Sequence, residues 1–358
     1  MKRFILAVLV IAAACSPDKT GSGSGSATPA NQPTGSVDLT GAGATFPNPI
    51  YSKWFSDYAA KTGVKINYQS IGSGGGIRQF SEQTVDFGAT DGPMSDVEIA
   101  GAKGGAVFHI PTVLGGVVVT YNLSEVSQPL KLTGPLVADI FLGKIKKWND
   151  PAIAGLNPGV QLPNKDLLVV HRSDGSGTTY VFSDYLTAVS PDWAKGPKKG
   201  KEVPWPVGLG GKGNEGVAGL VKQTAGAVGY VELAYAKQNS LPAAMIRNAA
   251  GNFIAPTIET ITAAASGVAD KLPPNTDYRI SIVNGPGANT YPISSFTWIL
   301  AYANQPDAVK GKKLVDFLRW ALTDGEKEAP ALDYAPLPSS MTGRLTTRLD
   351  SIKLGATR

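Results

Sequence analysis

The 358-residue sequence is poor in the residues that most often hold metals or carry out catalysis. It contains one cysteine, Cys15, and two histidines, His109 and His171. A single thiol cannot form an internal disulfide, and the few thiol and imidazole groups do not cluster with the spacing of a metal site. We therefore expect no disulfide framework, no metal and no other cofactor.

Motifs for nucleotide binding and nucleophilic catalysis are also missing. The sequence has no Gly-x-x-x-x-Gly-Lys-Ser/Thr loop and no Gly-x-Ser-x-Gly elbow. One Gly-x-Gly-x-x-Gly run, Gly208 to Gly213, follows a proline-rich segment rather than an apolar strand, so we interpret it as a turn. Side chains alternate along a strand, so His171 should point away from the side of Arg172 and should not form a nucleophilic pair with Ser176. These absences predict that the protein is not an enzyme.

The charge of the chain excludes another class of function. The net charge is only +5, and two of its positive charges, Lys2 and Arg3, lie in a segment that we expect to be removed. This mild, scattered charge predicts no nucleic-acid partner. The hydrophobic content of 42% is that of a globular protein, and the length suffices for one large or two ordinary domains.

The N-terminus has the pattern of a secretory signal. Lys2 and Arg3 precede an apolar run from Phe4 to Ala14, which is too short to span a membrane in the mature protein. Cys15 follows directly, so we predict a lipoprotein-type signal over residues 1–14 with lipidation of Cys15. Cleavage without lipidation is the alternative. Residues 15–36 are rich in Gly, Ser and Pro and predict a flexible tether. The signal, the lipidated cysteine and the tether together predict a protein in the periplasm or at the cell surface, anchored to a membrane.

From Leu39 onward, segments with strand and helix patterns alternate. Three short strand-like runs each end in a polar, glycine-containing loop, and two of these loops open a helix. This order predicts an α/β protein with a mainly parallel sheet. One helix should begin with Asn48 as its N-cap, end at Gly63, and bury the aromatic residues Tyr51, Trp54, Phe55 and Tyr58.

The second half of the chain predicts the same class of structure. We expect strands at Arg279 to Val283 and at Phe296 to Tyr302, followed by a helix from Pro306 to Leu322. The basic segment from Met341 to Arg358 is interpreted as a solvated helix, and we assign no role to it.

The segment from Val169 to Tyr180 is the strongest candidate for a binding site. A strand ends at His171, a glycine-rich turn follows, and a helix from Gly177 to about Val189 begins. The first N–H groups of a helix have no partner within it and lie at the positive end of its dipole, here beside Arg172. This arrangement predicts an anion site, in which Asp174 holds the guanidinium; a solvated turn is the alternative.

Similar loops elsewhere offer more uncharged donors. They include Thr45 with the amide of Phe46, Ser73 with the amides after it, and the group formed by Ser176, Gly177 and Thr178. Open parallel sheets bind ligands at the carboxyl ends of their strands, so these loops should converge there.

Asp91 stands out because a carboxylate among anion-binding donors should repel the ligand. The repulsion disappears if the ligand brings a proton for the carboxylate to accept, as phosphate does near neutral pH and sulfate does not. Asp91 therefore favours phosphate over sulfate. A loop-stabilising Asp before Pro93 is the alternative.

Many ordered segments resemble the periplasmic phosphate-binding proteins of bacterial ABC phosphate importers. The resemblance runs from about Leu39 to about Pro338 and rests on the blocks GAGATFP (41–47), IGSGGG (71–76), VDFGATD (85–91), PTVLGGVV (111–118), LGKIKKW (142–148), RSDGSGT (172–178), GLGGKGN (208–214), GAVGYVELAYAKQN (226–239) and LDYAPLP (332–338).

The resemblance implies a bilobal periplasmic-binding-protein fold in which two lobes, each with a central mainly parallel sheet flanked by helices, are joined by two chain crossings. The first lobe would comprise residues 37–117 and 293–345, the second 118–292, with 346–358 as a C-terminal tail. The family's phosphate contacts correspond to Thr45, Phe46, Ser73, Asp91, Arg172, Ser176, Gly177 and Thr178, and Asp174 matches the position that pairs with the arginine.

The implied function is high-affinity binding of inorganic phosphate and its delivery to the membrane permease of an ABC importer, by a protein expected to be monomeric. A receptor for another tetrahedral oxyanion such as sulfate is one alternative. A secreted phosphatase or esterase is an alternative from a different class.

Overall fold

The computed structural model describes residues 39–273 and 275–355. The predicted signal, Cys15 and the tether lie outside the described residues. None of the helices within these ranges has both the length and the apolar composition needed to cross a membrane.

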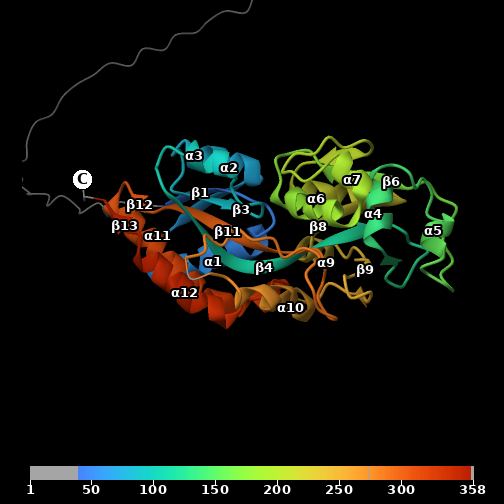
Figure 1. Cartoon of the computed structure of the whole chain (residues 1–358). Coiled ribbons are helices and arrows are strands. Elements are labelled where there is room, and N and C mark those ends of the chain that lie inside the picture. Colours follow the sequence, from blue (N-terminus) through green and yellow to red (C-terminus); the bar gives the residue numbers. More distant parts are fainter. Residues whose placement is uncertain (1–38, 274, 356–358) are drawn as a thin grey trace, which may run out of the picture. The chain divides into compact units, whose positions relative to one another are not determined.

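An eight-stranded mixed sheet forms the centre of the fold (Figure 1). Its strands, in spatial order, are β2 (Ile66–Ser70), β1 (Leu39–Gly43), β3 (Phe87–Thr90), β11 (Ser294–Tyr302), β4 (Val107–Tyr121), β8 (Ala227–Glu232), β6 (Leu168–Arg172) and β7 (Leu209–Gly211). The strands at either end of the order pair in parallel, β1 with β2 and β3, and β6 with β7 and β8. The α/β class predicted from the sequence is confirmed.

The two central strands run antiparallel and join the parallel groups. The first part of β4 pairs with β11 from Val107 to Gly116, and its last five residues pair with β8. Residues of β4 from His109 onward are buried, which explains its nearly continuous apolar sequence. One strand therefore belongs to both parts of the sheet.

Helices cover the sheet on both faces. They are α1 (Asn48–Thr62), α2 (Ser73–Ser81), α3 (Asp96–Ala100), α4 (Gly134–Phe141), α5 (Pro151–Ala154), α6 (Gly177–Val189), α7 (Pro191–Lys195), α8 (Gly213–Gln223), α9 (Leu233–Gln238), α10 (Ile258–Ala269), α11 (Ala308–Ala321) and α12 (Ser339–Asp350), with a 3-10 helix at Gly325–Leu332. Figure 1 shows α2 and α3 on one side of β1 and β3, and α1, α11 and α12 on the other. Small pairings outside the main sheet involve β5 (Lys131–Leu132), β9 (Met245–Arg247), β10 (Phe253–Ile254), β12 (Asn304–Gln305) and β13 (Lys353–Leu354).

Helix α1 confirms most of its prediction. Its four aromatic residues are buried, and Gly63 ends the helix in the left-handed conformation at φ 76°, donating its N–H to the carbonyl of Ala59 at 2.8 Å. The predicted cap is displaced by one residue, because Pro47 occupies the N-cap and Asn48 is already helical. Proline has no side-chain acceptor for the first N–H groups, so the helix begins without a side-chain cap.

Three other predictions are wrong in part. The described backbone from Arg279 to Val283 forms no strand. The glycine run predicted as a turn contains the short edge strand β7 before α8 begins at Gly213. The helix predicted in the tail is present as α12, but it buries Met341, Leu345 and Leu349 and is therefore part of the core rather than solvated.

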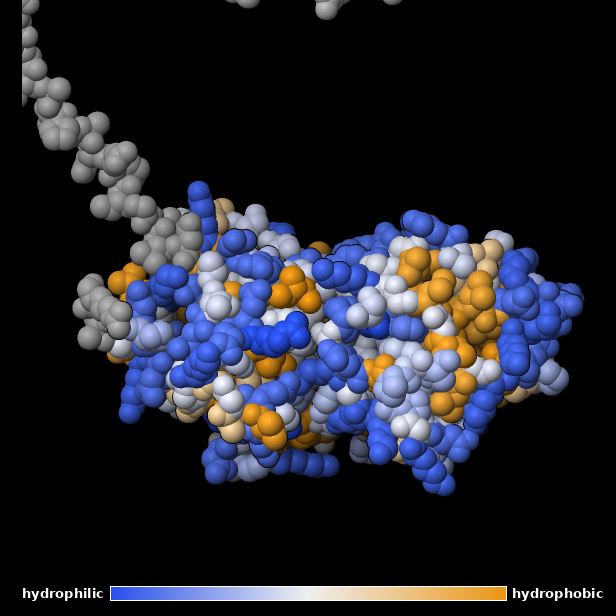
Figure 2. All heavy atoms as spheres, turned by 90° about the horizontal axis from the view of Figure 1, so that it is seen from above, coloured by the Kyte–Doolittle hydropathy of each residue, from blue (hydrophilic) through white to orange (hydrophobic). Residues whose placement is uncertain are grey.

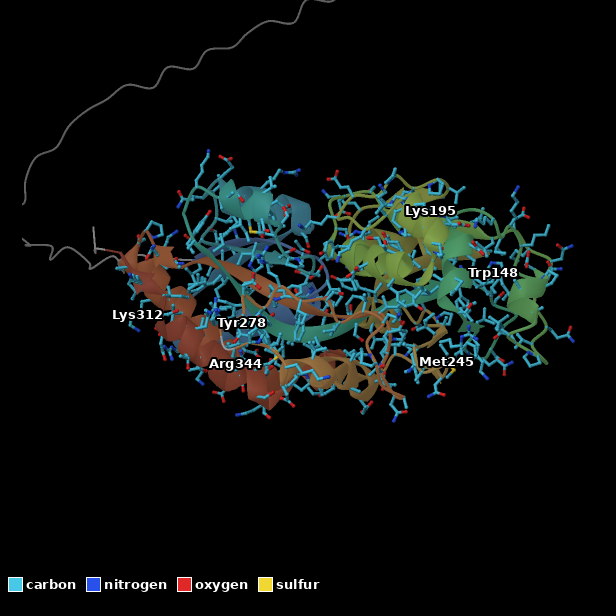
Figure 3. All side chains as sticks on the ribbon, viewed as in Figure 1. Trp148, Lys195, Met245, Tyr278, Lys312 and Arg344 are labelled. Atoms are coloured by element: carbon cyan, nitrogen blue, oxygen red, sulfur yellow. The ribbon has the colours of Figure 1, made fainter. Side chains whose placement is uncertain are left out.

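Basic residues of α12 also bind an irregular neighbouring segment. The Nη1 atom of Arg344 donates to the carbonyl of Leu272 at 3.2 Å, and its guanidinium lies 6.0 Å from the ring centroid of Tyr278. Figure 3 labels both Arg344 and Tyr278. Arg348 lies 4.7 Å from the ring centroid of Phe108. These contacts give the C-terminal helix a packing role that its sequence pattern does not reveal.

Hydrophilic side chains dominate the surface seen from above in Figure 2. Apolar side chains gather on this face over the part of the fold that carries α4, α7 and β6. The exposed large apolar residues in that part of the fold are Leu168, Val207 and Leu209.

Candidate functional site

The eight residues predicted to contact an anion are all buried, and they lie at or just after the ends of four strands, β1, β2, β3 and β6. Thr45 and Phe46 follow β1, Asp91 follows β3, and Arg172 ends β6; the others open α2 and α6. The exposed fractions are 3% for Thr45 and Arg172, 1% for Asp91 and 0% for Phe46, Ser73, Ser176 and Thr178, and Gly177 is buried as well. Buried polar groups need partners, so the contacts among them define the site.

A bidentate ion pair holds the guanidinium of Arg172. Asp174 accepts from Nε at 2.7 Å and from Nη2 at 2.6 Å, and it also accepts from the N–H of Gly213 at 3.0 Å. Burial acts to raise the pKa of Asp174, but the hydrogen bonds and charge of Arg172 outweigh it, so the pKa is lowered. The Nη1 atom of Arg172 donates a hydrogen bond to the hydroxyl oxygen of Thr178 at 3.2 Å. The predicted supporting contact of Asp174 is therefore present.

The N-termini of α2 and α6 meet through glycines. The N–H of Gly74 donates to the carbonyl of Gly175 at 2.8 Å. A Cβ atom on Gly177 would lie 2.5 Å from both Asp91 Oδ2 and Ser73 Oγ, which is closer than any side chain allows. Glycine at this position therefore lets Ser73, Asp91 and the start of α6 come together.

Asp91 is the one acceptor within this group of donors. Its Oδ1 accepts from the hydroxyl of Thr297 at 2.8 Å, and its backbone N–H donates to Ser73 Oγ at 3.3 Å. Burial raises the pKa of Asp91 to about 7, although the Thr297 hydrogen bond and the charge of Arg172 both act to lower it. Near neutral pH this carboxyl can hold a proton or accept one from a ligand.

Asn214, the second residue of α8, contacts two of the predicted hydroxyls. Its Nδ2 atom donates to Thr45 Oγ1 at 2.8 Å and to Thr178 Oγ1 at 3.0 Å. Its backbone N–H donates to Thr45 Oγ1 as well, at 3.1 Å. The sequence reasoning missed both Asn214 and Thr297; Asn214 lies in one of the blocks that carry the resemblance, whereas the sequence reasoning gave no signal for Thr297.

Two phenols fix the backbone of the loop after β1. The hydroxyl of Tyr235 donates to the carbonyl of Thr45, and that of Tyr334 donates to the carbonyl of Phe46, both at 2.6 Å. These side chains come from distant parts of the sequence, so the position of the loop depends on the whole fold. Tyr235 and Tyr334 were not among the predicted site residues.

The structure does not pair Ser176 with His171. The His171 ring stacks on Trp205 at 4.9 Å between centroids, and its Nδ1 lies 3.0 Å from the carbonyl oxygen of Arg172. Ser176 Oγ accepts from the N–H of Thr179 at 2.9 Å and caps α6. The hydroxyl therefore acts as a helix cap, as the first residue before a helix commonly does. Within the described part of the chain, no group of three His, Cys, Asp or Glu residues could hold a metal.

Comparison with families and curated proteins identifies relatives along most of the chain. The model of the PBP superfamily domain matches residues 23–324. The phosphate-binding protein PstS of Xylella fastidiosa is 46% identical over 324 residues, which cover 90% of this chain and 88% of the relative. The protein of that name from Haemophilus influenzae is 46% identical over 313 residues, with coverage of 87% and 92%.

Solved structures resemble the fold at low sequence identity. A phosphate-binding protein from Stenotrophomonas maltophilia has a TM-score of 0.69 at 19% identity, covering 87% of this chain and 93% of that one. A putative phosphate ABC transporter substrate-binding protein from Clostridium perfringens has a TM-score of 0.62 at 17% identity, covering 84% and 100%. These likenesses concern the fold alone, and they confirm the bilobal periplasmic-binding-protein fold. The chain belongs to the PBP superfamily and, within it, to the family of the PstS phosphate-binding proteins.

Proposed function

We propose that this protein binds inorganic phosphate outside the cytoplasmic membrane and delivers it to the permease of an ABC importer. The observation that carries the proposal is one buried acceptor, Asp91, among hydroxyl and N–H donors and a fixed guanidinium. A tetrahedral anion that carries a proton satisfies this set, because its proton meets Asp91 and its other oxygens meet the donors. The PstS relatives support the same ligand.

Each predicted site residue has a role in this proposal. Arg172 supplies the charge, and the hydroxyls of Thr45, Ser73, Ser176 and Thr178 donate hydrogen bonds. The backbone N–H groups of Phe46 and Gly177 donate as well, the latter at the positive end of α6. A hydrogen bond to a charged group contributes about 1.5–3 kcal/mol, so several such bonds support tight binding after desolvation of the anion. Binding of this kind requires no bond to be broken, and we propose that the protein is not an enzyme.

Closure of two lobes on the ligand completes the proposed mechanism. We assign residues 37–117 and 293–345 to one lobe and residues 118–292 to the other, with one crossing near the C-terminal end of β4 and the other just before β11. The hydrogen bond from the N–H of Gly74 to the carbonyl of Gly175 joins these two sets of residues, as closure of the lobes on a ligand requires.

Calorimetry on protein stripped of bound ligand tests the ligand directly. Phosphate should bind tightly, and sulfate should not compete at a comparable concentration. Arg172→Ala should weaken binding of any anion. Asp91→Asn should reduce the difference between the affinity for phosphate and the affinity for sulfate. Sulfate competing on equal terms with phosphate would exclude the proposed selectivity. Steady hydrolysis of a chromogenic phosphate ester, lost in Ser176→Ala, would show a phosphatase instead.

The attachment and assembly of the protein need separate measurements. We propose that Cys15 carries a lipid, that residues 15–36 tether the folded part to a membrane, and that the protein is a monomer. Mass spectrometry of the mature N-terminus tests the first point, since lipidation adds the mass of acyl chains to a chain that begins at Cys15. Light scattering of the purified protein tests the last.

A further inference from the structure

Asn214 lies at the centre of the hydrogen bonds described above, and none of the predicted roles includes it. It is fully buried, with an exposed fraction of 0%. Its orientation is fixed, because its Oδ1 accepts from the backbone N–H of Glu232 at 2.9 Å. An N–H group can only donate, so the amide oxygen must face Glu232 and the NH2 group must face the two threonines.

The donors around Thr178 leave its hydroxyl one remaining function. A hydroxyl oxygen has two lone pairs and one hydrogen. At Thr178, Arg172 Nη1 donates to one lone pair at 3.2 Å and Asn214 Nδ2 donates to the other at 3.0 Å. Neither donor can act as an acceptor, so the Thr178 proton must point elsewhere.

Thr45 is in the same situation. Its Oγ1 accepts from the backbone N–H of Asn214 at 3.1 Å and from Nδ2 at 2.8 Å. Among the described residues, neither this hydroxyl nor that of Thr178 has a protein acceptor for its proton. Both residues are buried, so an unpaired O–H would carry a desolvation cost that a bound anion removes.

We propose that Asn214 is a positioning and specificity-determining residue that fixes the hydroxyls of Thr45 and Thr178 as hydrogen-bond donors toward the ligand. The inference rests on the proposed phosphate site and names the group that sets the direction of its donors. With both hydroxyls fixed, Thr45 and Thr178 can only donate to ligand oxygens that carry no proton. Asp91 is then the group that receives the proton of the ligand. Asn214 makes this selection without touching the ligand itself.

A double-mutant cycle with phosphate titration tests the proposal. Asn214→Ala should weaken phosphate binding by roughly ten- to a hundredfold, the range expected for hydrogen bonds to a charged group. In a Thr178→Val background the same substitution should reduce the phosphate affinity by a smaller factor. In a Thr45→Val/Thr178→Val background it should reduce the affinity by less than about twofold. Equal losses in all backgrounds would overturn the proposal.

The Thr178 branch of the cycle separates the proposal from a simple clamp. Thr178 and Asn214 belong to helices that follow β6 and β7, in the same part of the sheet. A residue that only joined Thr45 to α8 would show coupling with Thr45 and none with Thr178. Coupling with Thr178 therefore supports the proposal, and its absence contradicts it.

Asn214→Asp provides a variant that preserves the shape of the side chain. It can still accept from Glu232, but it offers the threonine protons an acceptor and should lose at least as much affinity as the alanine variant. Relative to wild type at each pH, the loss should shrink as the pH falls, because the introduced carboxyl group can donate again once it is protonated. A loss independent of pH would indicate a structural role only. Asn67→Asp on the exposed face of β2 is the matched control and should bind as wild type does.

These outcomes are distinct from a failure of the proposed function. Wild-type protein that does not bind phosphate would refute the function and leave the cycle without a signal to measure. Wild-type protein that binds phosphate, with Asn214 variants that are folded and bind equally well, would refute the role of Asn214 alone. Thermal unfolding of each ligand-free variant shows whether it is folded.

Discussion

At the scale of single residues, the site depends on which atom holds a proton. Asp91 has a pKa raised to about 7 by burial, so phosphate and this carboxyl titrate in the same range. A phosphate oxygen and Asp91 can then share one proton, which a fully deprotonated anion could not provide. The raised pKa also has a consequence for the stability of the ligand-free protein.

Asp91 should make the ligand-free protein less stable as the pH rises. Its pKa in the folded protein, about 7, lies above the ordinary value of 3.8, so its favourable contribution is complete below about pH 4. The contribution is lost as the pH rises toward 7, by on the order of 1.4 kcal/mol for each pKa unit. Asp91→Asn should remove this dependence, which chemical unfolding at pH 4.5 and pH 7 can measure.

The comparison must use the difference between variant and wild type, because His109 has the opposite effect. Burial lowers the pKa of His109 to about 3, with a smaller contribution from Arg279, so stability is lost as the pH falls from about 6.5 toward 3. His109 is unchanged in Asp91→Asn and cancels in the difference. A difference that does not change with pH would contradict the role given to Asp91 burial.

The candidate site residues that the sequence indicates differ in their local sequence pattern from those that it does not indicate. Arg172, Asp91 and Ser176 lie in short polar loops beside apolar strands, where a charge or a glycine attracts notice. Asn214 and Thr297 are neutral side chains that reach the site only because the sheet brings distant segments together. Only the folded structure reveals such partners.

At the scale of elements, local pattern predicted some helices well. The helix from Gly177 to Val189 is confirmed at both ends, and the serine cap at Ser176 marks its start clearly. The predicted strand from Arg279 to Val283 is wrong. There Ile282 is buried by packing of an irregular segment, and this produces an apolar alternation without a partner strand.

Helix α12 should contribute measurably to stability. Leu345 is fully buried in it, so Leu345→Ala should lower the free energy of unfolding by about 2–5 kcal/mol. The exposed Thr347 on the same helix provides the control, and Thr347→Ala should change it by less than about 0.5 kcal/mol. Denaturant titration measures both. Equal, small effects would mean that this helix is not part of the core in solution.

Lys201 connects the start of α6 to the segment that leads into α3. Its Nζ donates to the carbonyl of Pro93 at 3.0 Å and pairs with Glu98 Oε2 at 2.8 Å, while its own carbonyl accepts from the N–H of Ser176. Lys201→Met should weaken phosphate binding by up to about fivefold at low salt and by less at high salt, because partly exposed ion pairs are screened. Phosphate titrations at two salt concentrations measure the effect.

The control for Lys201 is Lys195, an exposed residue at the end of α7 that Figure 3 labels. Lys195→Met removes the same charge and should leave the affinity unchanged. If both variants lose affinity equally, general attraction of the anion, rather than the contact with α3, accounts for the effect.

At the scale of the whole molecule, β4 runs from one proposed lobe into the other. Because β4 pairs with β11 over its first part and with β8 over its last five residues, relative motion of the proposed lobes must bend β4 between these two pairings. The sequence alone predicts the α/β class, while the borders of the lobes stay a prediction. The cause is that a long, continuously buried strand carries no pattern marking where one lobe ends.

Closure predicts a change in molecular dimensions. Phosphate-free protein should have a larger radius of gyration in small-angle X-ray scattering than phosphate-saturated protein, because ligand contacts from both lobes are absent. Arg172→Ala should remain in the expanded form at phosphate concentrations that compact the wild type. Identical scattering curves with and without phosphate would exclude closure of this kind.

The hydrogen bond between Gly74 and Gly175, which joins the N-termini of α2 and α6, has a consequence for the delivery of the ligand. Both helices direct the same positive pole toward the gap between them, and like poles repel when nothing negative lies in the gap. A cargo-free molecule that closed would have to overcome this repulsion, whereas a loaded one is drawn together by the anion. We therefore expect this repulsion to disfavour closure of the ligand-free protein, so that a closed protein that meets the permease carries an anion.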